Sequence, residues 1–126
     1  MQTIRLLIVD DEPALCWSLA SFMEEFGHEV TVAESAEEAL GILNTIDFDA
    51  GIIDLRLPGM SGDKLIPEAH KLQPDMVFLI HTGSSDYTVS PEVEAVGLSK
   101  HDVFMKPLED MTVLQDRLEC ILKKGN

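Results

Sequence analysis

The chain has 126 residues, and its 23 acidic side chains against 9 lysines and arginines give a net charge of −14. Hydrophobic residues make up 45% of the sequence, which suits one folded domain and excludes a disordered acidic tail. No apolar stretch approaches the roughly 18 residues of a membrane span, and the first residues turn acidic too early for a signal peptide. The acidity also argues against direct binding of nucleic acid, which needs clustered lysine and arginine.

The two cysteines, Cys16 and Cys120, are too few for a disulfide framework and lack the spacing of metal ligands. We therefore expect a reduced, cytoplasmic protein that contacts neither a membrane nor nucleic acid.

Five short apolar runs predict strands, and segments of helical period separate them. The runs cover residues 4–9, 30–33, 50–53, 76–80 and 103–105. The helices are expected from Pro13 to a stop at Gly27, after a capping box of Ser35 and Glu38, from about Ser61 to Leu72, and after Met111. Between the last two runs only residues 91–96 offer a turn or two of helix. This alternation predicts a parallel sheet covered on both faces, with an irregular or shortened fourth helix.

Polar side chains stand at the ends of four of the five runs. Asp10 and Asp11 follow the first, Asp54 the third, Thr82 the fourth and Lys106 the fifth. Because function gathers at the carboxyl ends of the strands in such sheets, we expect these side chains to meet at one rim. Taken singly, each has an ordinary alternative, such as Asp11 as the N-cap of the first helix or Asp54 as the start of a turn.

The chemistry of this set favours phosphoryl transfer. Carboxylates about 4 Å apart repel by about 4 kcal/mol per pair at an effective dielectric constant near 20. A hard divalent cation relieves this repulsion, and an all-oxygen site suits Mg²⁺, with Mn²⁺ as an alternative. Lys106 would add a mobile positive charge, Thr82 a hydroxyl donor, and the backbone near Arg56 and Gly83 further contacts to phosphate oxygens. A carboxylate nucleophile in such a site gives an aspartyl phosphate.

Four segments make the chain resemble a response-regulator receiver domain of two-component signalling. In order, they are LLIVDDE, IIDLRLPGMSG, LIHTGS and VFMKPL. The resemblance covers essentially all of residues 1–126, so we expect a single receiver domain with no effector domain in this chain. It implies a flavodoxin-like (βα)₅ fold with strand order 2-1-3-4-5.

The resemblance also implies a role for each residue at the rim. Asp54 would accept phosphate from a phosphohistidine on a sensor histidine kinase or a histidine phosphotransfer protein. Asp10, Asp11, the Asp54 side chain and the backbone carbonyl of Arg56 would hold Mg²⁺. Thr82 would be the switch hydroxyl, and Lys106 would pair with the phosphoryl group.

A protein of this kind is a phosphorylation-controlled signalling module rather than an enzyme. It would catalyse only its own phosphorylation and slow autodephosphorylation, and would switch a surface that docks to a separate downstream protein. The sequence leaves open the cognate kinase, the downstream target and the oligomeric state.

The chain departs from the family pattern around its fifth strand. Val103 stands where the family has the aromatic half of a Thr/aromatic switch, and Phe104, one place later, is expected to point to the opposite face. Gly83 replaces a more usual alanine, and the segment 97–102 is one residue longer than in the family. Tyr87 is a candidate substitute aromatic. We therefore hypothesise that the phosphorylation chemistry is intact while the conformational read-out is altered.

Two other functions compete with this interpretation. A pseudo-receiver would bind partners without phosphate, although the complete set of acids and lysine counts against it. An aspartyl-phosphate phosphohydrolase of the haloacid-dehalogenase type requires a second acid two residues after the nucleophile, where this chain has Arg56.

Other side chains are assigned no functional role. The scattered histidines have no metal spacing, and Trp17, Met23 and Phe26 are interpreted as packing residues.

Overall fold

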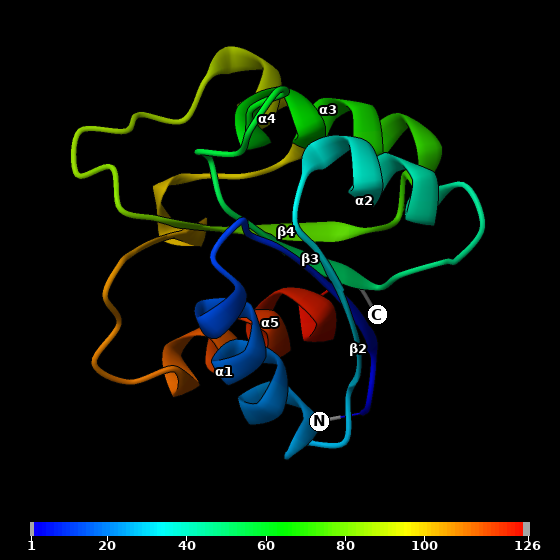
Figure 1. The fold of residues 1–126 in the computed structure, drawn as a ribbon, viewed down its shortest axis with the longest axis vertical. Coiled ribbons are helices and arrows are strands. Elements are labelled where there is room, and N and C mark those ends of the chain that lie inside the picture. The colour runs from blue at the N-terminus through cyan, green and yellow to red at the C-terminus, as the bar shows by residue number, and fades with distance from the viewer. Residues whose placement is uncertain (1, 125–126) are drawn as a thin grey trace.

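In a computed structural model, which describes residues 2–124, the chain forms one five-stranded parallel sheet between two layers of helices (Figure 1). The strands are β1 (Arg5–Val9), β2 (Glu29–Ala33), β3 (Ala50–Ile53), β4 (Val77–Thr82) and β5 (Val103–Met105). The helices are α1 (Pro13–Glu24), α2 (Ala36–Leu43), α3 (Gly62–Leu72), α4 (Pro91–Val96) and α5 (Thr112–Lys124), with a 3₁₀ turn, η1 (Lys100–Asp102), before β5. The strand order β2-β1-β3-β4-β5, with every pair parallel, confirms the predicted flavodoxin-like fold.

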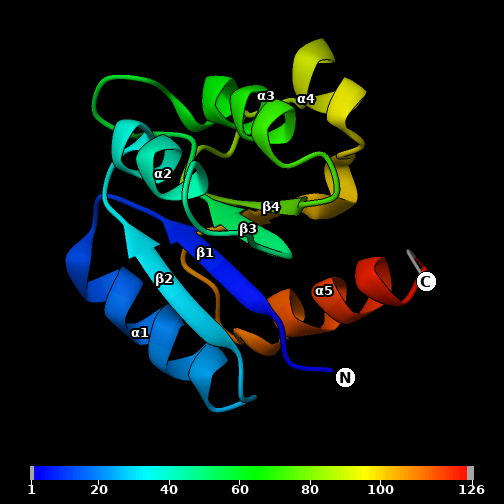
Figure 2. The same ribbon diagram turned by 90° about the vertical axis from the view of Figure 1, so that its right-hand side faces the viewer.

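The sheet is covered on both faces, as its apolar runs predict. Helices α1 and α5 lie on one face and α2, α3 and α4 on the other (Figure 2). Side chains alternate between these layers along β1, since Leu7 and Val9 belong to the core under α2–α4 while Leu6 and Ile8 belong to the core under α1 and α5. Both sets are buried, which explains why β1 reads as an uninterrupted apolar run.

The start of α1 differs from the expectation that Asp11 caps it. The N-cap is Glu12, and its side chain makes no capping hydrogen bond. The amide of Glu12 instead donates to Oδ1 of Asp10 at 3.0 Å, because the buried Asp10 carboxylate already lies beside the helix start. Asp11 is thereby left exposed at the rim.

Two aromatic residues interpreted as packing residues are not in the core. Trp17 is 73% exposed, so the prediction is wrong for Trp17 and right for Met23, which is fully buried. Phe26 is 42% exposed, but its ring packs edge-on against Phe22 at a centroid distance of 5.3 Å, so it is a packing residue at the surface. The physical reason is the angular position of the buried stripe, since α1 turns Cys16, Leu19 and Met23 toward the sheet. Trp17 falls outside that stripe.

Elsewhere the predicted caps are close to those observed. The Ser35 hydroxyl accepts from the amide of Glu38 at 3.1 Å, as expected at the start of α2. The Glu38 carboxylate reaches the amide of Glu34 at 3.4 Å, one residue earlier than a standard capping box requires.

The fourth helix is short, as predicted, and its ends are well defined. Ser90 caps α4, and Gly97 ends it in a left-handed conformation with φ of +117°. The longer connection that follows folds into η1, and its buried Asp102 forms a 2.8 Å ion pair with Arg117 of α5. The connection before β5 is therefore anchored to the last helix.

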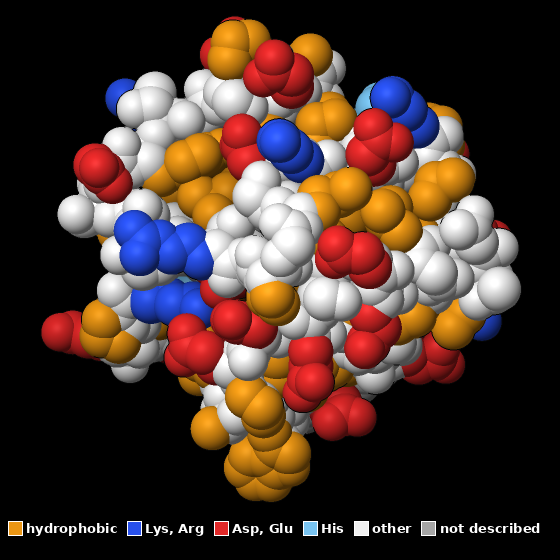
Figure 3. Space-filling model, turned by 45° about the horizontal axis from the view of Figure 1, so that its top comes forward, with side chains coloured by type: hydrophobic (Ala, Val, Ile, Leu, Met, Phe, Trp, Pro, Cys, Tyr) orange, Lys and Arg blue, Asp and Glu red, His pale blue; other side chains and the backbone are white. Residues whose placement is uncertain are grey.

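The acidic side chains outside the core are spread over the surface, as the face in Figure 3 shows.

Among residues 2–124, no helix combines the length and hydrophobicity that crossing a bilayer requires.

Candidate functional site

The carboxyl ends of four strands bring the predicted polar residues together. Asp10 follows β1, Asp54 follows β3, Thr82 ends β4 and Lys106 follows β5. The backbone amides of Asp10 and Asp54 still donate to the adjacent strands at 3.1 and 2.9 Å, and that of Lys106 donates to the carbonyl of Thr82 at 2.8 Å. The sheet itself therefore determines where these side chains begin.

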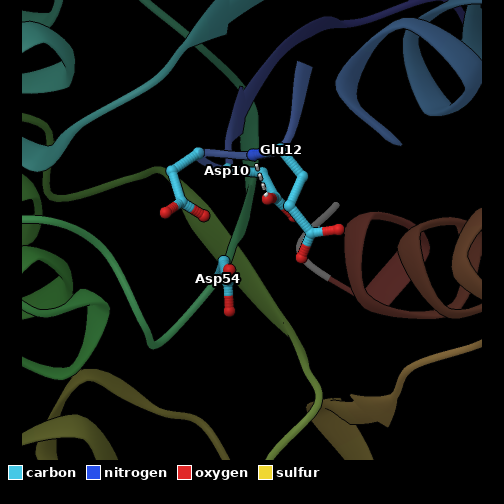
Figure 4. Close-up of side chains that lie close together, drawn as sticks. Asp10, Glu12 and Asp54 are labelled. Atoms are coloured by element: carbon cyan, nitrogen blue, oxygen red, sulfur yellow. Dashed lines mark hydrogen bonds between the residues drawn. The ribbon is translucent and has the colours of Figure 1, made fainter. Parts of the chain in front are cut away.

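Lys106 connects the acids of the rim. Its Nζ lies 2.8 Å from Oδ2 of Asp10 and 3.2 Å from both Oδ2 of Asp54 and Oε1 of Glu12. Figure 4 shows Asp10, Glu12 and Asp54 gathered at the end of the sheet. Burial alone would lower the pKa of Lys106, but hydrogen bonds and charges from Asp10 and Asp54 outweigh it, so the pKa lies above its ordinary value. The lysine is charged at neutral pH.

Asp54 is a buried carboxylate with two fixed partners. Its Oδ1 accepts from the amide of Arg56 at 3.3 Å, and its Oδ2 faces the Lys106 ammonium. Burial raises the pKa of Asp54, and the charge of Asp10 raises it further, while Lys106 opposes both effects. The rim therefore holds a carboxylate whose charge is only partly compensated.

The acids are close enough to hold one cation together. Each of Asp10, Asp11, Glu12 and Asp54 offers a carboxylate oxygen, and these oxygens all lie within 4.8 Å of one another. An all-oxygen set of this kind fits a hard cation such as Mg²⁺. Glu12 was not among the predicted ligands, and its only sequence signal is that it is the third acid of the DDE run.

Thr82 ends β4 beside this cluster, and Gly83 follows it. The Thr82 side chain is fully buried, and its Oγ1 accepts from the amide of Ser84 at 3.1 Å. A Cβ added at Gly83 would meet no heavy atom within 4 Å. Steric room thus does not explain why this chain has glycine there.

The fifth strand separates its two central side chains as expected. Val103 packs against the core under α2–α4, whereas Phe104 packs against the core under α1 and α5. Phe104 therefore does not replace the missing aromatic. Tyr87, from the connection between β4 and α4, packs on the same side as Val103.

Two residues near the rim were missed by sequence reasoning. A Cβ at Gly62 would overlap the carbonyl oxygen of Asp54, so the first residue of α3 must be glycine for the chain to pass this closely. His81 is buried, and neither ring nitrogen has a hydrogen-bond partner within residues 2–124. Burial, together with the charge of Lys106, lowers the pKa of His81. Gly62 lies in a turn-rich segment that hints at its role, and the sequence signal for His81 is its place next to Thr82, which by itself assigns it no role.

A doubly wound parallel sheet with a carboxylate cluster and a half-buried lysine at its carboxyl-end rim defines a flavodoxin-like α/β domain with a candidate cation site. The family described as the response regulator receiver domain matches residues 6–119, and the chain belongs to this family. It is thus a receiver domain of the two-component response regulators, as the sequence motifs predict.

Named relatives agree with this assignment. The two-component response regulator PhoP of Pseudomonas aeruginosa is 33% identical over 98% of this chain and 53% of its own length. The chain therefore spans about half the length of that curated relative. The receiver domain protein (CheY-like) from Methanospirillum hungatei is 33% identical with a TM-score of 0.75, over 98% of this chain and 94% of that one.

A third similar protein has been solved with ligands. The response regulator TrrA from Thermotoga maritima, a complex with Mg²⁺ and BeF, is 30% identical with a TM-score of 0.75. The match covers 95% of this chain and 96% of that one.

Proposed function

We propose that Asp54 is the phosphoacceptor of this receiver domain, with a phosphohistidine on a sensor histidine kinase or a histidine phosphotransfer protein as donor. The observation that carries the proposal is the Lys106 ammonium, which lies within 3.2 Å of carboxylate oxygens of both Asp10 and Asp54 at the end of the sheet. A half-buried cation next to a buried carboxylate suits a reaction that brings a negatively charged phosphoryl group to that carboxylate.

In the proposed transfer, an Asp54 carboxylate oxygen forms a bond to phosphorus as the nitrogen–phosphorus bond of the donor breaks. The donor imidazole keeps that bonding electron pair, and Asp54 becomes an aspartyl phosphate. Slow attack of water on phosphorus would later return the carboxylate and release inorganic phosphate. Positioning and charge compensation account for most of the catalysis in such transfers.

The cation site assigns further roles. Asp10, Asp11, the Asp54 side chain and the backbone carbonyl of Arg56 would hold Mg²⁺, or Mn²⁺ in its place, and Glu12 is close enough to join them. The bound cation would supply positive charge to the carboxylates and phosphoryl oxygens. The similar protein TrrA was solved in complex with Mg²⁺ and BeF, which supports this assignment.

The chain's own groups would complete the site. Lys106 would turn from Asp10 toward the phosphoryl group as its counter-charge, and the Thr82 hydroxyl would donate to a second phosphoryl oxygen. The backbone at Gly83 would contact the remaining oxygen. None of these roles needs a further substrate, so we propose a signalling module that catalyses only its own phosphorylation and dephosphorylation.

The proposed output is a protein surface that changes with phosphorylation and docks to a downstream protein. We place the reaction in the cytoplasm, in keeping with two cysteines that are both free thiols.

The proposal is tested by incubating the protein with Mg²⁺ and a small acyl phosphate, followed by intact-mass analysis. We expect one phosphoryl adduct that hydroxylamine removes, that chelation of Mg²⁺ prevents, and that Asp54→Asn abolishes. The matched control is Asp75→Asn, because Asp75 is exposed in the connection between α3 and β4. A wild-type protein that stays unmodified, even with candidate kinases, would instead be a pseudo-receiver.

A further inference from the structure

The connection between β4 and α4, residues 83–90, is held at both ends by hydrogen bonds. At its start the Thr82 hydroxyl accepts from the amide of Ser84, and at its end Ser90 caps α4. Tyr87 lies between them, half-buried on the same side of the sheet as Val103. The residues that stand where the family switch would operate are therefore Tyr87 and Val103.

One carboxylate on α3 holds the far end of this connection. The Tyr87 hydroxyl donates to Oδ1 of Asp63 at 2.6 Å, and the Ser90 hydroxyl donates to the same oxygen at 3.3 Å. Ser90 also accepts from the amide of Val93, so the contact with Asp63 and the start of α4 share one hydroxyl. Helices α3 and α4 lie side by side (Figure 2). The cluster of Asp63, Tyr87 and Ser90 connects the first turn of α3 to the segment that leads into α4.

A short path of contacts leads from this cluster back to the rim. The amide of Tyr87 donates to the carbonyl of Ser84 at 3.4 Å. Ser84 in turn binds Thr82 through its amide and accepts from the Arg56 guanidinium at 3.3 Å through its hydroxyl. These contacts connect the Thr82 hydroxyl to Tyr87 through Ser84.

The environment of Tyr87 leaves room for such a movement. Tyr87, Val89, Leu98 and Val103 line a surface groove of about 570 Å³, with Lys100 at its edge. Val103 is smaller than an aromatic side chain, so β5 does not fill this space. The Tyr87 ring has space to move into the groove if its hydroxyl leaves Asp63.

We propose that the hydrogen bond from Tyr87 to Asp63 is a latch that keeps the domain in its inactive conformation and replaces the Thr/aromatic switch. The inference rests on the proposed function, because it requires that Thr82 turn toward a phosphoryl group on Asp54. That turn takes Oγ1 of Thr82 away from the Ser84 amide, and the connection of residues 83–90 shifts. The Tyr87 hydroxyl then leaves Asp63. The Ser90 hydroxyl loses its contact with Asp63 as well and keeps only the amide of Val93 at the start of α4. Phosphorylation is thus read out at α3 and α4 through Tyr87.

Thermodynamic linkage predicts in which direction the affinity for a phosphoryl analogue changes when the latch is removed. If phosphorylation opens the latch, then removing the latch must favour the activated conformation and strengthen binding of a phosphoryl analogue by the same factor. Simple loss of stability would leave that binding unchanged or weaken it, so the direction of the change separates a latch from an ordinary structural contact.

The test measures the affinity for beryllofluoride in Mg²⁺, together with amide hydrogen exchange over residues 84–96. We expect Tyr87→Phe to bind beryllofluoride about tenfold more tightly, the change that one hydrogen bond of ordinary strength supports. Without ligand, its α4 amides should exchange as fast as those of beryllofluoride-bound wild type. Asp63→Asn, which keeps an acceptor oxygen but loses the charge, should fall between the two. Ser85→Ala, an exposed change in the same connection, should match wild type.

The latch is overturned if Tyr87→Phe and wild type bind beryllofluoride equally, or if binding leaves exchange at α4 of wild type unchanged. Intact mass after acyl phosphate treatment separates this failure from that of the proposed function. A wild type that gains phosphate but shows neither effect refutes the latch alone. A wild type that gains no phosphate and binds no beryllofluoride refutes both.

Discussion

The Nζ of Lys106 lies 2.8 Å from Oδ2 of Asp10, and their side chains are only 13% and 5% exposed. This ion pair joins β5 to β1 across the intervening strands of the sheet. Its ammonium also lies 3.2 Å from Asp54, so one cationic side chain compensates two buried carboxylates. Asp10 and Asp54 both belong to the carboxylate cluster that could hold a divalent cation.

The first prediction follows from this shared occupancy. Lys106→Met removes a positive charge that competes with Mg²⁺ for Asp10 and Asp54. We therefore expect Mg²⁺ to bind about tenfold more tightly. This change corresponds to a modest part of the repulsion between the ammonium and a cation about 4 Å away. Titration calorimetry with MgCl₂ measures the affinity. Lys71→Met is the control, because Lys71 is exposed and pairs with Glu68 on its own helix. Equal affinities of Lys106→Met and wild type would show that the ammonium does not compete.

The second prediction concerns the buried ring of His81, whose two nitrogens have no hydrogen-bond partner among residues 2–124. A buried polar group without a partner costs about 1–3 kcal/mol, so His81→Leu should raise the free energy of unfolding by an amount in that range. The folded-state pKa of His81 lies below the ordinary 6.5, so wild type should lose stability relative to His81→Leu as the pH falls below 6.5. Urea unfolding at pH 5 and pH 7.5 measures both effects. A difference between the two proteins that does not change with pH would refute the second.

The third prediction concerns the close approach of α3 to the acceptor residue. Gly62→Ala places a Cβ against the Asp54 carbonyl, and because backbone cannot move away cheaply we expect a loss of about 1–3 kcal/mol in unfolding free energy. Phosphorylation by acyl phosphate should slow as well, since the acceptor backbone is displaced. Gly41→Ala is the matched control in α2, where a Cβ meets nothing within 4 Å. That change should stabilise the protein by about 0.5–1 kcal/mol.

The fourth prediction concerns Trp17 and Met23, which the sequence alone predicts to be packing residues of α1. Trp17→Ser should change the unfolding free energy by less than about 0.5 kcal/mol, because Trp17 is 73% exposed. Met23→Ala should cost about 2–5 kcal/mol, because Met23 is fully buried. Thermal and urea unfolding of both variants measure the contrast. Similar losses would place Trp17 in the core.

The strands and the rim were predictable because their signals are local. Residues 50–53 form β3 at the predicted bounds, since a strand covered on both faces is apolar throughout. Asp54 and Lys106 follow such strands directly, so the parallel arrangement of the sheet is enough to bring them to one edge. Even the short α4 was predicted, because proline and glycine mark its two ends.

What the sequence determined by itself is therefore the order of elements and the residues at the strand ends. Only the tertiary structure decided that Trp17 faces solvent, that His81 has no hydrogen-bond partner within residues 2–124, and that Tyr87 bonds to Asp63, 24 residues earlier. The physical reason is that periodicity reports how a residue faces its own strand or helix. Contacts between side chains on different elements depend on how those elements pack, and no local pattern encodes that distance.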